Sequence, residues 1–466
     1  MRSLHLLIGV TAAGFAVTGV CAQTQPGQGA ADDPFLALPE LGDRPSQVEG
    51  MLTLPSSDGG QDPLVARERM SRRSAAEARP RGSTVLQRGR PDYDPVGVKA
   101  GSFTLFPSLT LSAGGRTNVR GSGDGDVFGT VRAAGVLRSD WSRHQLVLDG
   151  YIDRRQFASF EDESSTNWLG RARGRLNIHG RDTITAELSS ERVVQERGAI
   201  GELVRTRQPA SFQRDSARVE GTFHSGRFAA TLQGGYSDRN YDDISIEEGQ
   251  PLDQGYRDHE TYEAGIDLGY QFGAPRNLFV SAFKTWTRYR LDSMPSRDVD
   301  TLELLAGIRS EITPLIRGQF AIGYLRANFK DPAVSTRDGI AIDTRLEYLM
   351  TELTTFSLRA RRYVRSIQSV RSPGAVATTF RLGVDHELLR NLILSGAVRH
   401  ERANYVDSPR KDRLTGLEAG ATWFLNRKMR ASLRGNAYRR KSYNLEIEDD
   451  RDFKAATITA GITFQL

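Results

Sequence analysis

The sequence has little of what builds disulfide-rich, metal-binding or collagen-like proteins. It contains 1 Cys and 7 His in 466 residues, which leaves little material for a disulfide framework or a metal cluster. Its 46 Gly and 18 Pro follow no fixed period, which excludes a collagen-like chain. Hydrophobic residues make up 38% and the mean hydropathy is −0.45. Beyond the N-terminus no run reaches the roughly 20 apolar residues of a spanning helix, so a polytopic helical membrane protein is excluded.

Lysine is also scarce. Of the 63 basic residues only 7 are lysine, and the other 56 are arginine. Because the guanidinium group makes planar, bidentate contacts, we expect these arginines to be organised rather than scattered. The formal net charge of +6 is too small for this length to indicate nucleic-acid binding.

The N-terminus predicts export from the cytoplasm. One charge at Arg2, a short apolar run and small residues before Gln23 are typical of a secretory signal peptide covering residues 1–22. The alternative is a lipoprotein lipidated at Cys21, although Val20 is large for the position before such a cysteine. Cleavage after Ala22 leaves a mature chain without cysteine, which fits the envelope of a Gram-negative bacterium.

Residues 23–97 are rich in Pro, Gly, Ser, Asp and Arg and show no apolar periodicity. Such a segment cannot bury enough apolar surface to offset its ordering entropy, so we expect a disordered periplasmic segment. It could be a tether for a partner or a simple spacer.

Residues 98–466 alternate apolar with polar or small residues, which places the apolar side chains on one face of a strand. The last segment shows this most clearly, with Ile458, Ile462 and Phe464 on one face and Thr457, Thr459 and Thr463 on the other. The pattern is weakest in residues 279–291.

Short and long breaks alternate between these segments. Eight short and nine long breaks delimit 18 segments, and an even number of antiparallel strands with such connections is typical of an outer-membrane barrel. We therefore expect an all-β transmembrane antiparallel up-and-down β-barrel of about 18 strands, with the N-terminal segment and the C-terminus in the periplasm. The alternative, a soluble solenoid or set of sandwiches, would rarely alternate its connections so regularly.

The C-terminus carries a second signal. Gly461, Phe464 and Leu466 resemble the terminal signal that hands barrel proteins to the outer-membrane assembly machinery, although the final residue there is most often aromatic. The expected partners are therefore outer-membrane lipid and this barrel assembly machinery.

Several strand starts and turns resemble one known family. The stretches are Arg90–Phe103 with Phe106–Ser108, Leu137–His144, Gly323–Pro332, Val384–Asn391 and Ala437–Tyr443. Together they make residues 90–466 similar to the beta-barrel porin 2 (BBP2) family of outer-membrane proteins, common in alphaproteobacteria. The resemblance implies an outer-membrane location and an association with exopolysaccharide production, but no substrate or catalytic residue.

The face opposite the apolar one should line the barrel interior, and it is rich in charge. The basic residues predicted to line it are Arg171, Arg173, Arg175, Arg309, Arg317, Arg345, Arg359, Arg361, Arg381, Arg430 and Arg434. The acidic ones are Glu263, Asp267, Glu303, Asp343 and Glu347. Opposed charge stripes would suit a pore for hydrated or acidic sugars; alternatively, cross-strand ion pairs hold the wall together. The longest loops, 197–208 and 242–256, are candidates to constrict the lumen.

No catalytic, metal or cofactor motif stands out. Asp385-His386-Glu387 is the only acid–His–acid run, and strand alternation would point His386 towards lipid. The loop Gly121–Gly129 lacks the strand-to-helix context of a phosphate cradle. We therefore expect no enzyme and no cofactor.

The sequence favours a porin-like channel for saccharides or other hydrated solutes. A link to exopolysaccharide export, and so to polysaccharide export proteins, is a further hypothesis. The alternative is a non-conducting structural or assembly barrel that docks a periplasmic or surface partner, with an outer-membrane hydrolase as a third reading.

Overall fold

The computed structural model describes residues 84–200, 206–245, 251–272, 276–291, 296–313, 315–365, 372–444 and 452–466. The predicted signal peptide and most of the predicted disordered segment lie outside these residues. The described helices are two short 3-10 turns, Glu161–Glu163 and Gly255–Arg257. None of the described helices is long and apolar enough to cross a membrane.

Eighteen antiparallel strands form one closed barrel, which confirms the predicted fold class and strand number. The strands are β2 (Phe103–Arg116), β3 (Asp126–Ser139), β4 (Gln145–Phe157), β5 (Ser165–Asn177), β6 (Thr183–Val194), β7 (Ser211–Ser225), β8 (Phe228–Tyr241), β11 (His259–Gln271), β12 (Arg276–Tyr289), β13 (Val299–Thr313), β14 (Ile316–Phe329), β15 (Arg337–Thr351), β16 (Thr354–Arg365), β17 (Ala375–Leu389), β18 (Leu392–Tyr405), β19 (Lys411–Asn426), β20 (Met429–Tyr443) and β21 (Phe453–Gln465). The last strand pairs with the first, from Ser108 opposite Gln465 to Arg116 opposite Thr457. Closure leaves no unpaired barrel edge, which a sheet in lipid requires.

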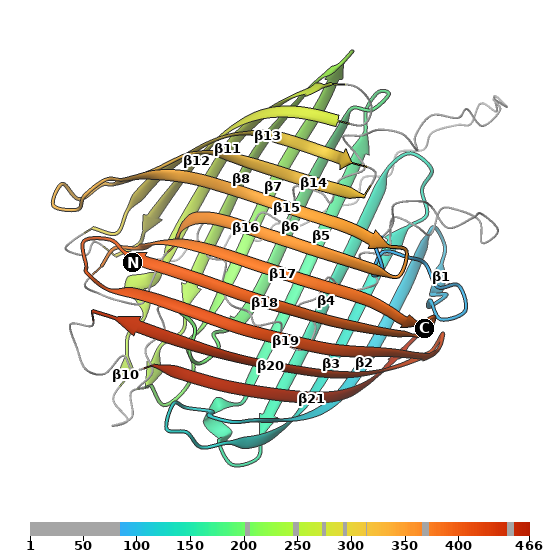
Figure 1. Cartoon of the computed structure of the whole chain (residues 1–466), viewed down its shortest axis with the longest axis horizontal. Helices are drawn as coiled ribbons and strands as arrows, with labels where there is room; N and C mark the ends of the chain where they lie inside the picture. The colour runs from blue at the N-terminus through green and yellow to red at the C-terminus, as the bar shows by residue number, and fades with distance from the viewer. Residues whose placement is uncertain are drawn as a thin grey trace, which may run out of the picture.

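The two ends of the barrel differ in their connections. At one end, here the short-turn end, neighbouring strands are joined by two to five residues; at the other, the long-loop end, by five to seventeen. The first barrel strand starts and the last one stops at the short-turn end, where the segment around β1 (Val98–Ala100) and the C-terminus lie together (Figure 1). β1 forms a small hairpin with β2 there, and β9 (Ile244–Ser245) pairs with β10 (Pro251–Leu252) in the loop before β11.

The outer face carries the apolar side chains of the alternating pattern. Leu232, Ile322 and Ile458 are exposed by 52%, 51% and 58%, and each lies on a different side of the barrel. Such an exposed apolar surface around the whole circumference is stable only when lipid covers it. Tyr324, Tyr348 and Trp423 are also exposed on this face, and aromatic side chains of this kind suit the membrane interfaces.

The weak alternation predicted near residues 279–291 has a structural reason. Phe279 and Phe283 of β12 are buried, while Leu278 and Val280, the two neighbours of Phe279, are exposed. Both faces of this strand are therefore apolar. The ring of Phe279 lies beneath the guanidinium of Arg309, 4.2 Å from ring centre to Cζ, so the inner face here is a packed wall.

Candidate functional site: the barrel interior

A segment that precedes the barrel lies inside its short-turn end. We call residues 84–94 the N-terminal insert. Arg88 and Arg90 both bind one Glu387 oxygen on β17, at 3.2 and 3.0 Å, and all three side chains are buried. Burial lowers the pKa of Arg90, an effect that the charge of Glu387 opposes. Two buried guanidinium groups therefore share one carboxylate of the barrel wall as their ion-pair partner.

Apolar contacts complete the seat of the N-terminal insert. Val85 packs with Ile393 of β18 and Phe424 of β19 in a buried cluster that Leu86 and Tyr93 adjoin. The backbone N–H of Val85 donates to Thr355 Oγ1 at 3.1 Å. The sequence lacks periodicity here and therefore predicts that these residues belong to the disordered segment. Their order comes from residues about 300 positions away, which no local pattern reveals.

The loop between β6 and β7 reaches across the long-loop end. Arg197 forms a buried ion pair with Glu163, 2.7 Å between Nη2 and Oε1. Further along the loop, Arg440 of β20 donates to the carbonyl of Ala199 at 2.7 Å. Arg365 of β16 donates to the carbonyl of Ile200 at 3.3 Å. Because β16 and β20 lie on the other side of the barrel from β6 and β7, the loop crosses the interior, as predicted for a constricting loop.

Close packing seats this loop on the opposite wall. Ala199 and Ile200 join a buried cluster with Tyr438 of β20 and Phe453 of β21. Gly198 has a φ of +83°, and a Cβ placed there would lie 2.2 Å from Phe453. Only glycine fits both the backbone conformation and the space.

Glu196 introduces a buried carboxyl group into the same loop. Burial raises its pKa, while the charges of Arg116, Arg155 and Arg399 act in the opposite direction. Its Oε2 has no hydrogen-bond partner among the described residues. The carboxyl group therefore takes up a proton at a higher pH than an ordinary glutamate does.

The other long loop, expected at 242–256 to constrict the lumen, remains near its own strands in its described part. Ile244 is buried, and Gln254 donates its backbone N–H to Asp243 at 3.1 Å. Arg257 stacks on Tyr241 of β8, with Cζ 3.7 Å from the ring centre. Among the described contacts of these two loops, those that cross the barrel are made by the β6–β7 loop.

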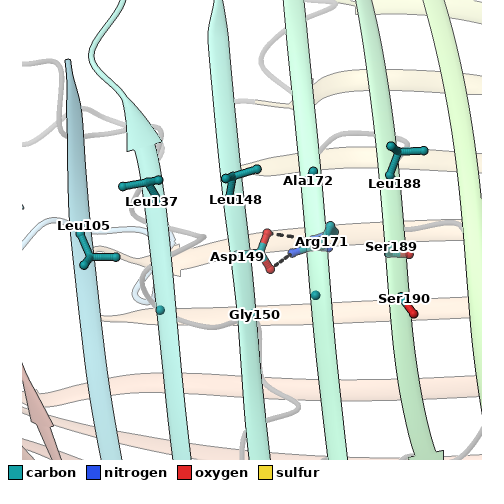
Figure 2. Close-up of a pocket in the computed structure, with 12 residues that line it drawn as sticks. Leu105, Leu137, Leu148, Asp149, Gly150, Arg171, Ala172, Leu188, Ser189 and Ser190 are labelled. Carbon is teal, nitrogen blue, oxygen red and sulfur yellow. Dashed lines mark hydrogen bonds and ion pairs between the residues drawn. The ribbon is translucent and has the colours of Figure 1, made fainter. Parts of the chain in front are cut away.

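The structure places all the predicted lumen residues on the inward face and joins many of them as ion pairs. The pairs are Arg171–Asp149 (2.9 Å), Arg173–Glu187 (2.7 Å), Arg309–Asp267 (2.9 Å), Arg317–Glu347 (2.7 Å), Arg345–Asp343 (3.6 Å), Arg381–Glu418 (2.7 Å) and Arg218–Glu263 (3.5 Å). Figure 2 shows the two parallel hydrogen bonds of Arg171 to Asp149 across β4 and β5. Ion pairing across and along the wall therefore accounts for these arginines.

The remaining predicted lumen residues differ in their surroundings. Glu303 is buried at 1% exposure, and Arg361 lies 5.6 Å from the ring centre of Tyr363. Arg175 of β5 and Arg430 and Arg434 of β20 also lie on the inward face. Arg359 is exposed within the barrel.

A shallow hollow lies on the outer face of β3–β6 (Figure 2). Its small outward residues are Gly135, Gly150, Gly170 and Ala172, and leucines such as Leu137 and Leu188 surround them. The charged pair Asp149–Arg171 belongs to the opposite face of the same strands. The hollow is part of the lipid-facing surface.

The acid–His–acid run and the C-terminal residues singled out in the sequence have the following surroundings. His386 contacts Thr354, 2.9 Å from Nδ1 to Oγ1, on the outward side of β17. Within the described ranges no group of three or more His, Cys, Asp or Glu could hold a metal ion. The exposed C-terminal residues Phe464 and Leu466 lie on the outer face, with Gly461 packed against Ser112 of β2.

A closed barrel with an apolar outer belt and a charged interior defines a porin-like outer-membrane protein. Residues 90–466 match the family described as "Putative beta-barrel porin 2", and the chain belongs to this family. The resemblance stated from the sequence is thereby confirmed. Comparison with curated proteins finds no match.

Solved structures with a similar fold are distant in sequence. The siderophore receptor PirA of Acinetobacter baumannii has a TM-score of 0.45 and 8% identity, covering 78% of this chain and 80% of its own. The ferric enterobactin receptor PfeA of Pseudomonas aeruginosa has a TM-score of 0.42 and 8% identity, with 77% and 80% covered. A bacterial polysaccharide outer membrane secretin has a TM-score of 0.31 and 11% identity, with 77% and 98% covered. At these scores the neighbours carry no argument about function.

Proposed function

We propose that the protein is an outer-membrane channel for saccharides or other hydrated solutes, restricted at both ends by inserted segments. The observation that carries this is a charged inner wall that remains accessible between the two inserts. Arg359 is exposed there, and the side chain of Arg381 keeps 43% of its surface accessible despite its ion pair. A barrel of 16 to 18 strands is too wide for wall side chains to fill, so water occupies what the inserts leave.

The short-turn end faces the periplasm in this proposal. Bacterial outer-membrane barrels have short periplasmic turns and longer extracellular loops. The N-terminal insert then narrows the periplasmic mouth, and the β6–β7 loop narrows the outer one. A link to exopolysaccharide export, with polysaccharide export proteins as partners, is a narrower form of the proposal that the family resemblance suggests. The protein then carries solutes without catalysing a reaction.

A non-conducting barrel that docks an envelope partner is the second candidate. The observation in its favour is that both ends hold inserted segments with buried ion pairs, Arg90–Glu387 at one and Arg197–Glu163 at the other. Such pairs would suit a permanently closed barrel.

Solute flux separates the two candidates. Proteoliposomes with the mature protein should swell in isotonic sugar faster than protein-free liposomes. A variant lacking residues 23–94 should swell faster still, because its short-turn end is open. Swelling at the protein-free rate in both preparations would refute the channel and favour the docking barrel.

A further inference from the structure

Four arginines oppose one another directly across neighbouring strands of the inner wall. Arg345 of β15 is opposite Arg359 of β16, which is opposite Arg381 of β17, which in turn is opposite Arg399 of β18. We call these four the arginine row. Like charges directly opposite in a sheet are destabilising, and natural sequences keep such violations mainly where a function requires them.

The arginine row lies between the two inserted segments. On β16, Thr355 accepts the hydrogen bond from Val85 of the N-terminal insert, and Arg365 donates to Ile200 of the β6–β7 loop. Arg359 is situated between these two anchor points. A solute that passes one constriction therefore meets the arginine row before the other.

The wall neutralises the arginine row only in part. Arg381 binds Glu418 at 2.7 Å. Arg399 binds Glu401 at 3.1 Å, but Glu401 is shared with Arg365. Among the described residues Arg359 contacts no carboxylate, and it is exposed. The centre of the row thus presents positive charge to the interior.

Small side chains lie beside the arginine row on its short-turn side. Ser357, Gly383 and Ala397 oppose one another on β16, β17 and β18. A Cβ at Gly383 would lie 3.3 Å from Nη1 of Arg381, so this guanidinium lies over the glycine. The small residues leave the guanidinium groups uncovered on that side.

We propose that the arginine row binds a linear polyanion with a carboxylate on successive units, such as an oligosaccharide of uronic acids. Adjacent strands are about 4.8 Å apart, a repeat comparable with one sugar unit of an extended glycan. The planar guanidinium fork binds carboxylates through two parallel hydrogen bonds, which a lysine cannot do. This inference rests on the proposed function in one respect, because the solute must reach the interior.

Isothermal titration of the mature protein in detergent with tetragalacturonate tests the binding site directly. Tetragalacturonate should bind, a neutral maltotetraose should not, and added salt should weaken the binding. Arg359→Gln should weaken binding about tenfold, the effect of one charged hydrogen bond, and Arg359→Lys should restore only part of it. Arg132→Gln is the matched control, because it removes the same charge from the inner face of β3, where Arg132 stacks on Tyr151.

The outcomes distinguish this inference from the proposed function. Equal binding of the neutral and acidic oligosaccharides, or unchanged binding in Arg359→Gln, would overturn the site. Inorganic phosphate binding as tightly as tetragalacturonate would overturn the polyanion and leave a simple anion site. Binding without solute flux would uphold the site and refute the channel, whereas flux without binding would do the reverse.

Discussion

Glu387 should hold the N-terminal insert in the barrel, and its neutralisation should release the insert while the barrel stays folded. In Glu387→Gln the buried Arg88 and Arg90 lose the carboxylate that they share at 3.2 and 3.0 Å. Breaking a buried ion pair from one side costs about 3–5 kcal/mol. At about 1.4 kcal/mol per factor of ten, the released state should gain at least a hundredfold in population. The barrel itself keeps its strand pairing, because the substitution changes only the side chain and leaves the backbone of Glu387 paired with Ile393 of β18.

Limited trypsin digestion of the detergent-solubilised protein measures this release. The bond after Arg88 is buried with the N-terminal insert, and the bond after Arg90 resists trypsin because Pro91 follows it. Mass spectrometry should therefore detect a fragment starting at Gly89 much earlier in Glu387→Gln than in the wild type. Heat-modifiable electrophoretic mobility shows in parallel that the barrel is folded.

A matched variant two residues away controls for the loss of charge. Asp385 lies on the same inward face of β17 and binds Ser395 at 2.6 Å rather than the N-terminal insert. Asp385→Asn should leave the Arg88 bond protected. Equal protection of that bond in Glu387→Gln and the wild type would refute the reasoning.

Three further predictions concern the outer constriction and the C-terminus. Gly198→Ala should displace the β6–β7 loop from Phe453, because the new Cβ has no room and a positive φ is strained; single-channel conductance should rise, and an unchanged value would contradict the packing. Because burial raises the pKa of Glu196, the docked loop binds a proton more tightly than the undocked loop, so docking strengthens as the pH falls through that raised pKa. Conductance should thus fall on acidification, and Glu196→Gln should abolish that dependence. Phe464→Ala should lower the amount of barrel in the outer membrane while leaving the purified barrel folded, as fractionation and heat modifiability would show; undiminished assembly would remove Phe464 from the signal.

The barrel could be predicted because its physics is local and repetitive. A strand in lipid needs an apolar outer face, so the period of two is present in nearly every segment, as Ile458 and Ile462 show. The same alternation also predicts which residues of each strand lie on the inward face. Where an inner face is also apolar, as at Phe279 and Phe283, the pattern blurs although the strand remains.

The contents of the barrel could not be predicted in the same way. The contact of Arg90 with Glu387 joins residues almost 300 positions apart, in a stretch whose composition is that of a disordered segment. The arginine row could not be predicted for a related reason. The alternation of side chains along each strand places Arg345 and Arg359 on the inward face. Only the register of β15 and β16 shows that they are directly opposite.

Single-channel recording in planar bilayers tests the central claim most directly, namely that water fills the interior between two inserted constrictions. The mature protein should give small or infrequent conductance steps, and removal of residues 23–94 should give larger ones, with preference for anions in a salt gradient. Absence of steps from both proteins, with both shown to be folded and inserted, would contradict a water-filled interior.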